Sequence, residues 1–232
     1  GYKFAELAGH NVTKLYPALV GINLKENVSE LAGVTLKNVS CSILANGKVL
    51  AEETGEMLFT HTGVSGPIIL TMSSLINKVQ GDLQLAIDLK PALDEKTLDN
   101  RLLRDFEANS NKEFKNAVAD LTVKALLPLV IKNSKINVDK KVNQITKEER
   151  ARLVFSLKNM TFNISGLCGL SGAIVTSGGV DVKQINPKNM QSKLVKGLFF
   201  AGEVLDIDGF TGGFNIQIAL STGYVAGISA ID

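Results

Sequence analysis

Polar and apolar positions alternate along the first third of the chain, and this period of two is typical of half-buried β-strands. The alternation runs from Val39 to Ile43, and Asn46-Gly47 then supplies the residue pair that favours a type I′ hairpin turn. A second alternating stretch, Leu83 to Leu89, ends before a proline. We therefore predict a small antiparallel sheet or barrel with one buried face over residues 12–93.

One segment inside this region departs from the alternation and predicts a short helix. Ser65-Gly66-Pro67 has the composition of a turn, and the apolar residues that follow it up to Leu75 repeat at helical spacing. Proline is favourable at an early helical position because its missing N–H would have no acceptor within the helix. We expect a helix to begin near Pro67.

The apolar period becomes that of an α-helix between residues 94 and 158. Two apolar faces are expected, formed by Leu98, Leu102, Leu103 and Phe106 on a first helix and by Phe114, Ala117, Val118 and Leu121 on a second. A third helix begins at a capping box of Thr146 and Glu149. Arg150 and its charged neighbours are interpreted as a solvated helix face. With no titratable residue on an apolar face, this helical insertion is expected to serve packing, gating or partner binding rather than catalysis.

A β pattern returns after the helical region. Met160 to Ile164 alternates again, so the chain is expected to rejoin the barrel there. Further along, the apolar segment Gly197 to Gly202 follows a polar connection and is interpreted as a buried strand.

Composition and charge exclude several classes of function. Of the 232 residues 45% are hydrophobic, and 25 basic residues are scattered among 23 acidic ones, which predicts no nucleic-acid partner. No apolar run approaches the roughly 20 residues that a membrane helix needs, so no membrane association is expected. The two cysteines, Cys41 and Cys168, form no C-x-x-C pair or metal-ligand cluster, which favours a reducing, cytoplasmic setting and no metal site.

The candidate chemistry lies in the last quarter of the chain. An apolar run ends at Gly202-Glu203, where a carboxylate can accept hydrogen bonds from ligand hydroxyls; a helix N-cap or a solvated loop acid has the same sequence. Gly212-Gly213 then opens a long apolar helix, whose free N–H groups and dipole favour an anionic or electron-rich ligand. Small residues recur at Ala219, Gly223 and Gly227 and predict close packing of this helix against a sheet.

Several segments together resemble one family of flavoproteins. They are Leu58–Pro67, Thr176–Val180, Gly197–Asp206 and Gly209–Asn215. The resemblance is to the bacterial HI0933-like family, also called the aminoacetone oxidase or BaiN-like family. It implies a two-dinucleotide-binding-domain FAD fold that is interrupted by an inserted barrel and helical unit. The fold class expected is therefore α+β: an antiparallel β-barrel with an inserted helical unit, plus the C-terminal part of an FAD-binding α/β fold.

The resemblance and the patterns together give a plan of five segments. They are residues 1–11, a remnant of the FAD-binding domain; 12–93, the β-barrel insert; 94–158, the helical subdomain; 159–172, a strand that returns to the barrel; and 173–232, the C-terminal FAD-binding segment.

The resemblance also implies roles for individual residues. Cofactor-binding residues would be Thr176, Gly178, Gly179, Gly202, Glu203, Asp206, Gly212, Gly213, Phe214 and Asn215, and substrate-pocket residues would be Thr62, Gly63, Ser65 and Gly66. By spacing alone, Thr176–Val180 favours a plain glycine turn. His61 is the candidate catalytic residue, as a proton relay beside a flavin, and a histidine hydrogen-bonded into its turn is an equally good interpretation. His10 is expected to face solvent.

FAD is the cofactor that the resemblance implies for the full-length protein, with a small-molecule substrate and NAD(P)H as a candidate electron donor. The dinucleotide fingerprint G-x-G-x-x-G occurs nowhere in the chain, so we expect a C-terminal fragment that holds no FAD by itself and is inactive. The expected function is that of a fragment of a flavin-dependent oxidoreductase acting on an unidentified small molecule by hydride or electron transfer. The alternative is a non-catalytic ligand- or protein-binding module with a barrel and a helical cap.

Overall fold

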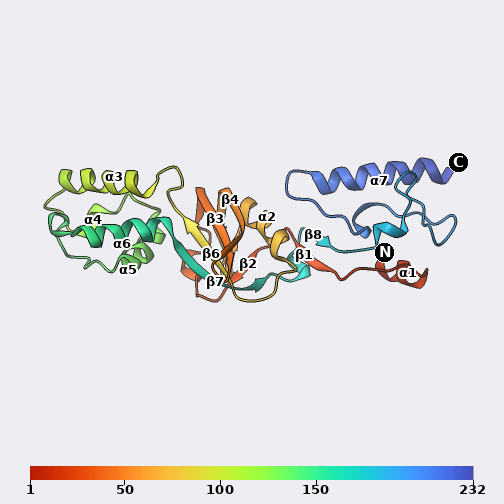
Figure 1. Cartoon of the computed structure of the whole chain (residues 1–232), viewed down its shortest axis with the longest axis horizontal. Coiled ribbons are helices and arrows are strands. Elements are labelled where there is room, and N and C mark those ends of the chain that lie inside the picture. The colour runs from red at the N-terminus through yellow and green to blue at the C-terminus, as the bar shows by residue number, and fades with distance from the viewer. Residues whose placement is uncertain (232) are drawn as a thin grey trace. The chain divides into compact units, whose positions relative to one another are not determined.

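The computed structural model describes residues 1–231, which form two compact units (Figure 1). The first unit contains Gly1–Ile22, Ile69–Gln80 and the chain from Leu167 onward. The second contains Asn23–Ile68 and Gly81–Gly166. The first unit is therefore assembled from three separate stretches of sequence.

The second unit is built around a closed barrel of six strands. Its strands, in their order around the barrel, are β2 (Ile22–Leu24), β5 (Gly63–Ser65), β4 (Lys48–Phe59), β3 (Thr35–Ala45), β6 (Leu83–Asp88) and β7 (Met160–Leu167). The pairs β3–β4, β3–β6, β4–β5 and β6–β7 are antiparallel. The predicted antiparallel barrel is confirmed, and β7 rejoins it as expected.

The long β3–β4 hairpin shows how local sequence sets the barrel register. Asn46 and Gly47 have φ values of 50° and 75°, and Ala45 pairs with Lys48 across them. Positive φ at both central positions is what a type I′ turn requires. The predicted hairpin is confirmed.

The barrel interior is filled by the alternating apolar positions. Cys41, Ile43, Phe59, Leu85 and Ile87 are all fully buried, and they come from three neighbouring strands. Phe162 of β7 also packs in this interior, with its ring edge to face against Phe59 and the ring centroids 5.9 Å apart. The period of two therefore identifies the buried face correctly.

The chain leaves the barrel through a glycine turn into α2 (Pro67–Ile76). Gly66 has φ +102°, and a Cβ there would lie 2.9 Å from the Cα of Met57, so only glycine fits between the strand and the turn. The predicted helix start at Pro67 is confirmed. Most of α2 belongs to the first unit, as does β1 (Tyr16–Ala18), whereas the predicted barrel segment 12–93 includes both.

The helical insertion lies between β6 and β7 (Figure 1). Its helices are α3 (Glu95–Ala108), α4 (Phe114–Ala117), α5 (Leu127–Ser134) and α6 (Lys147–Lys158). The chain's short 3-10 turns are η1 (Ser29–Leu31), η2 (Lys124–Leu126), η3 (Val142–Gln144), η4 (Leu170–Gly172), η5 (Val182–Gln184) and η6 (Gly202–Val204). The capping box at the start of α6 is confirmed in both of its hydrogen bonds.

The end of α6 is fixed to the last residues of β6 and the loop after it. The Nζ of Lys158 lies 2.6 Å from a carboxylate oxygen of Asp88 and donates to the carbonyl oxygens of Lys90 and Leu93. The backbone N–H of Leu89 donates to Leu157 O at 2.9 Å. The entry and exit of the insertion therefore lie together on the barrel.

Two predictions about the insertion are wrong. The second helix is a single turn, because β-branched Val118, Thr122 and Val123 weaken its continuation.

Arg150 is only 9% exposed, and its guanidinium forms a two-point ion pair with Asp99 of α3, with 3.1 Å between Nη2 and Oδ2. Helical spacing puts Arg150 on the same face as Leu153 and Leu157, so the solvated-face interpretation fails there and a titratable residue does lie on an apolar face.

The first unit contains α1 (Tyr2–Leu7), a two-stranded antiparallel sheet of β1 and β8 (Val175–Ser177), and the long helix α7 (Phe214–Ile231). Its core is a cluster of side chains from distant parts of the sequence. They are Ala5, Val180, Ile185, Met190, Phe200 and Leu205.

The predicted buried strand Gly197–Gly202 does not form. Phe199 makes a single bridge with Gln191, and Phe200 N donates to Met190 O at 3.0 Å. Phe200 is nevertheless buried, at 8% exposure. An apolar run indicates burial, but a strand also needs a neighbouring strand to pair with, and here the backbone pairs with a turn.

His10 also differs from its prediction. It is buried, with its ring edge toward Phe200 and its Nε2 2.7 Å from Ser192 Oγ. A residue nine positions after Gly1 is easily mistaken for an exposed one, because the segment that covers it comes from more than 180 residues later.

Helix α7 is long, apolar and largely uncovered. Ile216, Leu220, Tyr224 and Ile228, four residues apart, are 68%, 65%, 70% and 48% exposed. A Cβ at Gly223 or at Gly227 would meet nothing within 4 Å, so the predicted close packing of this ridge is not present. Its 18 residues have a mean hydropathy of 1.3, and by length and composition alone it is the one described helix that could cross a membrane. The expectation that no apolar run approaches that length is wrong.

Candidate functional site

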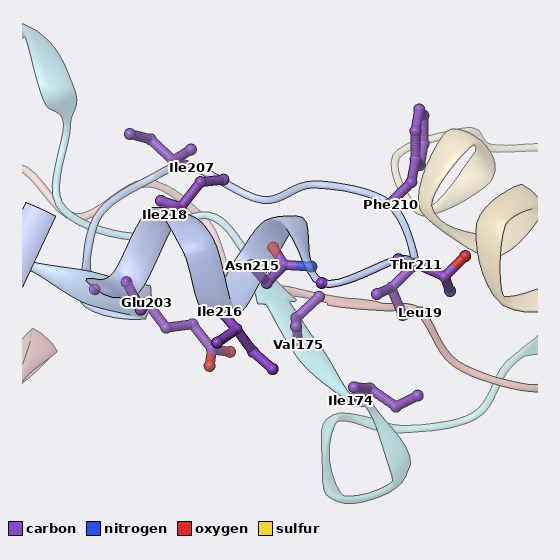
Figure 2. A pocket seen from close by; sticks show the side chains of 14 residues that line it. Leu19, Ile174, Val175, Glu203, Ile207, Phe210, Thr211, Asn215, Ile216 and Ile218 are labelled. Atoms are coloured by element: carbon purple, nitrogen blue, oxygen red, sulfur yellow. The ribbon is translucent and has the colours of Figure 1, made fainter. Parts of the chain in front are cut away.

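A pocket of about 420 Å³ lies at the N-terminal end of α7 in the first unit (Figure 2). Its walls come from the segment after β1, from β8, from η6 and from the loop that leads into α7. The lining residues are Leu19, Ile174, Val175, Gly202, Glu203, Ile207, Phe210, Thr211, Gly212, Gly213, Asn215, Ile216, Ile218 and Ala219.

Gly212 and Gly213, directly before α7, leave the backbone accessible from this pocket. Gly212 and Gly213 have φ values of +110° and +89°, a region that residues with a side chain rarely adopt. A Cβ at Gly213 would meet nothing within 4 Å, so the space beside it is open. The first intrahelical bond joins Gln217 N to Gly213 O at 3.0 Å, which leaves the preceding N–H groups of the first turn available to a ligand. That turn contains no acidic residue to offset the positive end of the helix dipole.

Asn215 fixes the shape of the loop before the helix. Its side-chain Oδ1 accepts a hydrogen bond from Gly209 N, and its Nδ2 donates to Gly209 O, both at 2.8 Å. Figure 2 shows Asn215 in the first turn of α7, with Thr211 on the loop that leads into it. Thr211 Oγ1 lies 3.3 Å from Thr71 Oγ1 of α2. The amide of Asn215 thus orders the loop and positions the N–H groups around it.

Glu203 joins η6 to β8 at the edge of the pocket. Its Oε1 accepts a hydrogen bond from Thr176 N at 2.8 Å, and its own carbonyl accepts one from Tyr2 OH at 3.3 Å. Burial raises the pKa of Tyr2, and the nearby Glu203 charge raises it further against the lowering effect of a hydrogen bond with Thr176. The carboxylate is therefore held in place while remaining exposed.

Three other predicted cofactor residues lie in a crossing of backbone segments beside the pocket. A Cβ at Gly178 would lie 2.3 Å from Lys14 O, and one at Gly179 would lie 2.6 Å from Val204 O. Asp206 accepts a hydrogen bond from Thr13 Oγ1 at 3.0 Å. These glycines permit a close approach of the protein to itself, and their contacts with a cofactor remain predictions.

Phe214 does not line the pocket; its ring is 59% exposed and lies over Gly212. The structure instead adds lining residues that were not among the predicted site residues, all of them apolar except Thr211. They are Leu19, Ile174, Val175, Ile207, Phe210, Thr211, Ile216, Ile218 and Ala219. Leu19 is contributed from the far end of the chain, with a φ of 49° and its N–H bonded to Ser74 Oγ, and no local pattern marks it.

His61 and the predicted substrate-pocket residues all lie in the second unit, around the loop between β4 and β5. His61 is exposed. Thr62 Oγ1 donates to Asn23 Oδ1 at 2.8 Å, and Gly63 and Gly66 are buried in the packing of the strands. Ser65, the last residue of β5, is partly buried. The structure brings these residues to one loop, and their roles in substrate binding and proton transfer remain predictions.

Cys41 is buried in the barrel, and Cys168 is partly buried. Burial raises the pKa of Cys41 to about 12, so its thiol stays protonated beside Met57 Sδ at 3.5 Å. Within residues 1–231, no group of three or more histidine, cysteine or acidic side chains is placed to hold a metal ion.

The chain is an α+β protein with an inserted barrel domain. One unit is a closed six-stranded barrel with a helical insertion, and the other contains a pocket lined in part by Gly212 and Gly213. The chain belongs to the HI0933-like family. The family model for the HI0933-like protein barrel and H2TH domain matches residues 16–175.

Three curated relatives are similar over almost the whole chain. A 3-dehydro-bile acid delta(4,6)-reductase of Clostridium scindens is 27% identical over 235 residues, 100% of this chain and 58% of the relative. Two proteins named ribosomal RNA dihydrouridine synthase are each 33% identical: that of Escherichia coli over 97% of this chain and 54% of its own, and that of Haemophilus influenzae over 99% and 55%. The chain therefore spans little more than half the length of these relatives.

Proposed function

We propose that this chain is part of a flavin-dependent oxidoreductase and that its pocket holds the ring and ribityl part of FAD. One observation carries the proposal: open space at Gly213, the N-terminus of an 18-residue helix and the Glu203 carboxylate meet in a single pocket. A flat conjugated ring needs a close approach of backbone, and glycine allows it. A volume of about 420 Å³ falls within the range of small-molecule sites and suits a part of FAD rather than the whole.

The chain's own residues would hold this group in three ways. The N–H groups and dipole of the first turn of α7 stabilise negative charge at the pyrimidine edge of the ring. Glu203, held by Thr176, accepts a hydrogen bond from a ribityl hydroxyl. Apolar side chains such as Val175 and Ile218 would exclude water from the ring.

The names of the relatives support one reaction class. A delta(4,6)-reductase acting on a 3-dehydro steroid and an enzyme that makes dihydrouridine both add hydrogen to a carbon–carbon double bond conjugated with a carbonyl group. Bound FAD supplies hydride transfer for such a reduction. We therefore infer that the protein reduces an activated double bond, with NAD(P)H as electron donor, in the cytoplasm. His61 is the candidate proton donor to the substrate.

The rest of the FAD site would come from residues outside this chain. The adenosine and pyrophosphate need contacts beyond those of a 420 Å³ pocket, and G-x-G-x-x-G is absent from the 232 residues. The uncovered apolar face of α7 would pack against the same additional residues. This chain alone is therefore expected to bind no FAD and to be inactive.

An RNA substrate is the second candidate, beside a steroid-like small molecule. The two relatives named as ribosomal RNA dihydrouridine synthases are more similar to the chain, at 33% identity, than the bile-acid reductase at 27%. If uracil in RNA is the substrate, the expectation of no nucleic-acid partner is wrong. The reaction at the flavin would be the same for both substrates.

The test uses the full-length protein. We expect its absorbance spectrum to contain flavin bands, and expect NAD(P)H to bleach them and a substrate with a conjugated double bond to restore them. Two substrates, an unsaturated 3-oxo steroid and a uridine-containing RNA, would distinguish the candidates. A colourless full-length protein would contradict the proposal and favour a non-catalytic binding module with a barrel and a helical cap.

A further inference from the structure

The helical insertion carries most of the chain's positive charge. Residues 94–158 contain 14 lysines and arginines against 10 aspartates and glutamates, a formal charge of +4. The remaining residues contain 11 basic and 13 acidic side chains, a formal charge of −2. The net charge of the whole chain is therefore close to zero although the helical insertion is basic and the remaining residues are acidic.

A groove of about 720 Å³ runs along the helical insertion between the end of α5, α6 from Ala151 onward and the start of β7. It is lined by Lys132, Asn133, Lys135, Ala151, Arg152, Phe155, Ser156, Asn159 and Thr161. Three of these side chains are cationic and none is acidic. We call this surface the α5–α6 groove.

Local structure fixes the backbone at Lys135 and the side chain of Arg152 in the α5–α6 groove. Lys135 closes α5 in the left-handed conformation, with φ 53° and its N–H bonded to Lys132 O at 3.2 Å. Arg152 Nε donates to Ser134 O at 3.0 Å and so connects α6 to the same helix end. Both lysines are exposed. The ion pairs found among residues 1–231 include none of the three cations.

Two acidic residues of α6 interact with Arg152 and also take part in other hydrogen bonds. Glu148 and Glu149 lie one turn before Arg152, whose charge contributes to lowering the pKa of both. For Glu149 the largest cause is a hydrogen bond from Lys140, whose Nζ lies 2.7 Å from its carboxylate. Arg152 is thus partly compensated by these carboxylates, whereas the ion pairs found among residues 1–231 include neither Lys132 nor Lys135.

An aromatic ring lies among these cations. Phe155 is 58% exposed, whereas Leu153 and Leu157 of the same helix are fully buried. A flat exposed ring beside basic side chains is suited to nucleic-acid bases and phosphates, because every base can stack on it while the cations meet the backbone. Asn159 and Thr161 add hydrogen-bonding groups at the groove edge.

We propose that the α5–α6 groove binds single-stranded RNA, with phosphates at Lys132 and Lys135 and a base stacked on Phe155. The inference rests on the proposed function in its RNA form and names the surface that would hold the strand. A neutral or singly charged steroid would use neither the spread of cations nor their number, whereas an RNA backbone supplies one negative charge per nucleotide.

The test measures binding of a fluorescein-labelled 12-nucleotide oligouridylate to the full-length protein by fluorescence anisotropy, over a series of salt concentrations. Lys132→Gln combined with Lys135→Gln should weaken binding at least about tenfold at 0.1 M salt. It should also reduce the slope of log affinity against log salt by about 1.4, since each lost contact with single-stranded phosphate contributes about 0.7. Phe155→Leu, which keeps an apolar side chain but removes the ring, should weaken binding about fivefold or more.

Two controls separate RNA recognition from general attraction of polyanions. Lys37→Gln with Lys48→Gln removes two exposed charges from the barrel and should leave binding unchanged. Dextran sulfate should lose affinity for the lysine variant but not for Phe155→Leu. Unchanged RNA binding in both groove variants, an equal loss in the barrel control, or no RNA binding by the wild type would overturn the inference.

The flavin spectrum keeps the two proposals distinguishable. Both groove variants should retain wild-type flavin absorbance and bleaching by NAD(P)H, because the groove lies in the other unit from the FAD pocket. RNA binding without flavin would contradict the proposed function alone. Flavin reduction with RNA binding unaffected by the groove variants would contradict this inference alone.

Discussion

The two units of this molecule differ in how completely they bury their apolar side chains. In the barrel unit, Phe59, Leu85 and Leu153 are fully buried, although they come from two strands and a helix of the insertion. In the first unit, the longest helix contains no buried residue over 18 positions. The sheet of that unit has two strands of three residues each.

Because of this difference in burial, the two units obtain their stability from different contacts. The barrel closes its hydrogen bonds and its core with residues of its own sequence, as a closed barrel must. The first unit leaves an apolar stripe from Ile216 to Ile228 exposed to water, which is unfavourable unless something covers it. The barrel unit is therefore expected to be stable by itself, and the first unit to depend on further contacts.

The largest expected effect is in the barrel core. Phe59→Ala should lower the free energy of unfolding by about 3–5 kcal/mol, because it leaves a cavity among fully buried neighbours. Urea unfolding followed by far-UV circular dichroism suits a chain without tryptophan. Phe155→Ala, the same substitution at a ring that is 58% exposed, should change the value by less than about 1 kcal/mol. Equal losses in both variants would contradict the assigned core.

The next effect concerns the ion pair inside the helical insertion. Asp99→Ala leaves the Arg150 guanidinium without its carboxylate, at side-chain exposures of 11% for the arginine and 31% for the aspartate. We expect a loss of about 2–3 kcal/mol, between the values for exposed and fully buried pairs. The double variant Asp99→Leu with Arg150→Met should recover part of that loss. Arg150 would be a solvated residue after all if the single variant were as stable as the wild type.

A smaller, pH-dependent effect is expected at the start of α6. A hydrogen bond from Lys140 and another from Thr146 N lower the pKa of Glu149 below its ordinary value. A lowered pKa in the folded state means that the stabilisation is present above the unfolded pKa and is lost as the pH falls through the folded one. Glu149→Gln should therefore lower the melting temperature at pH 7, and this difference should shrink as the pH falls through the folded pKa. A difference that stays the same at low pH would show that the charge is irrelevant.

The smallest expected effect is on the uncovered face of α7. Leu220→Ala should change the stability of this chain by no more than about 0.5 kcal/mol, because Leu220 is 65% exposed. In the full-length protein the same substitution should cost about 2 kcal/mol or more if additional residues cover the face. Thermal melts of both forms test the comparison between the units directly. Identical small effects in the two forms would leave α7 without a protein cover.

Features set by short-range signals could be predicted from the sequence. Asn46-Gly47 and the capping box of Thr146 and Glu149 depend on residues within four positions of one another, and both form as expected. The alternation around Cys41 and Ile43 identifies the buried face because a strand has only two faces.

Features that depend on distant partners could not be predicted. Gly197–Gly202 has the apolar composition of a strand but no strand beside it, and Arg150 is buried because Asp99 on another helix supplies its partner. Leu19 reaches the pocket across most of the chain length. The pair Gly212-Gly213 is a local sequence signal for an open backbone at the N-terminus of α7. Gly178 and Gly179, by contrast, are needed because segments 13–15 and 204–206 cross them.

Titration of FAD into the apo form of the full-length protein would show whether the pocket at the N-terminus of α7 holds a flavin. Gly213→Val should weaken FAD binding at least about tenfold, because the side chain enters open space that the ring would fill. Glu203→Ala should weaken it about tenfold through the loss of a charge-assisted hydrogen bond. Without FAD, Glu203→Ala should retain most of its melting temperature, whereas Gly213→Val should lose part of it, because valine rarely adopts the φ of +89° at this position. Unchanged FAD affinity in both, or a loss of apo stability that accounts for the whole effect, would contradict the claim.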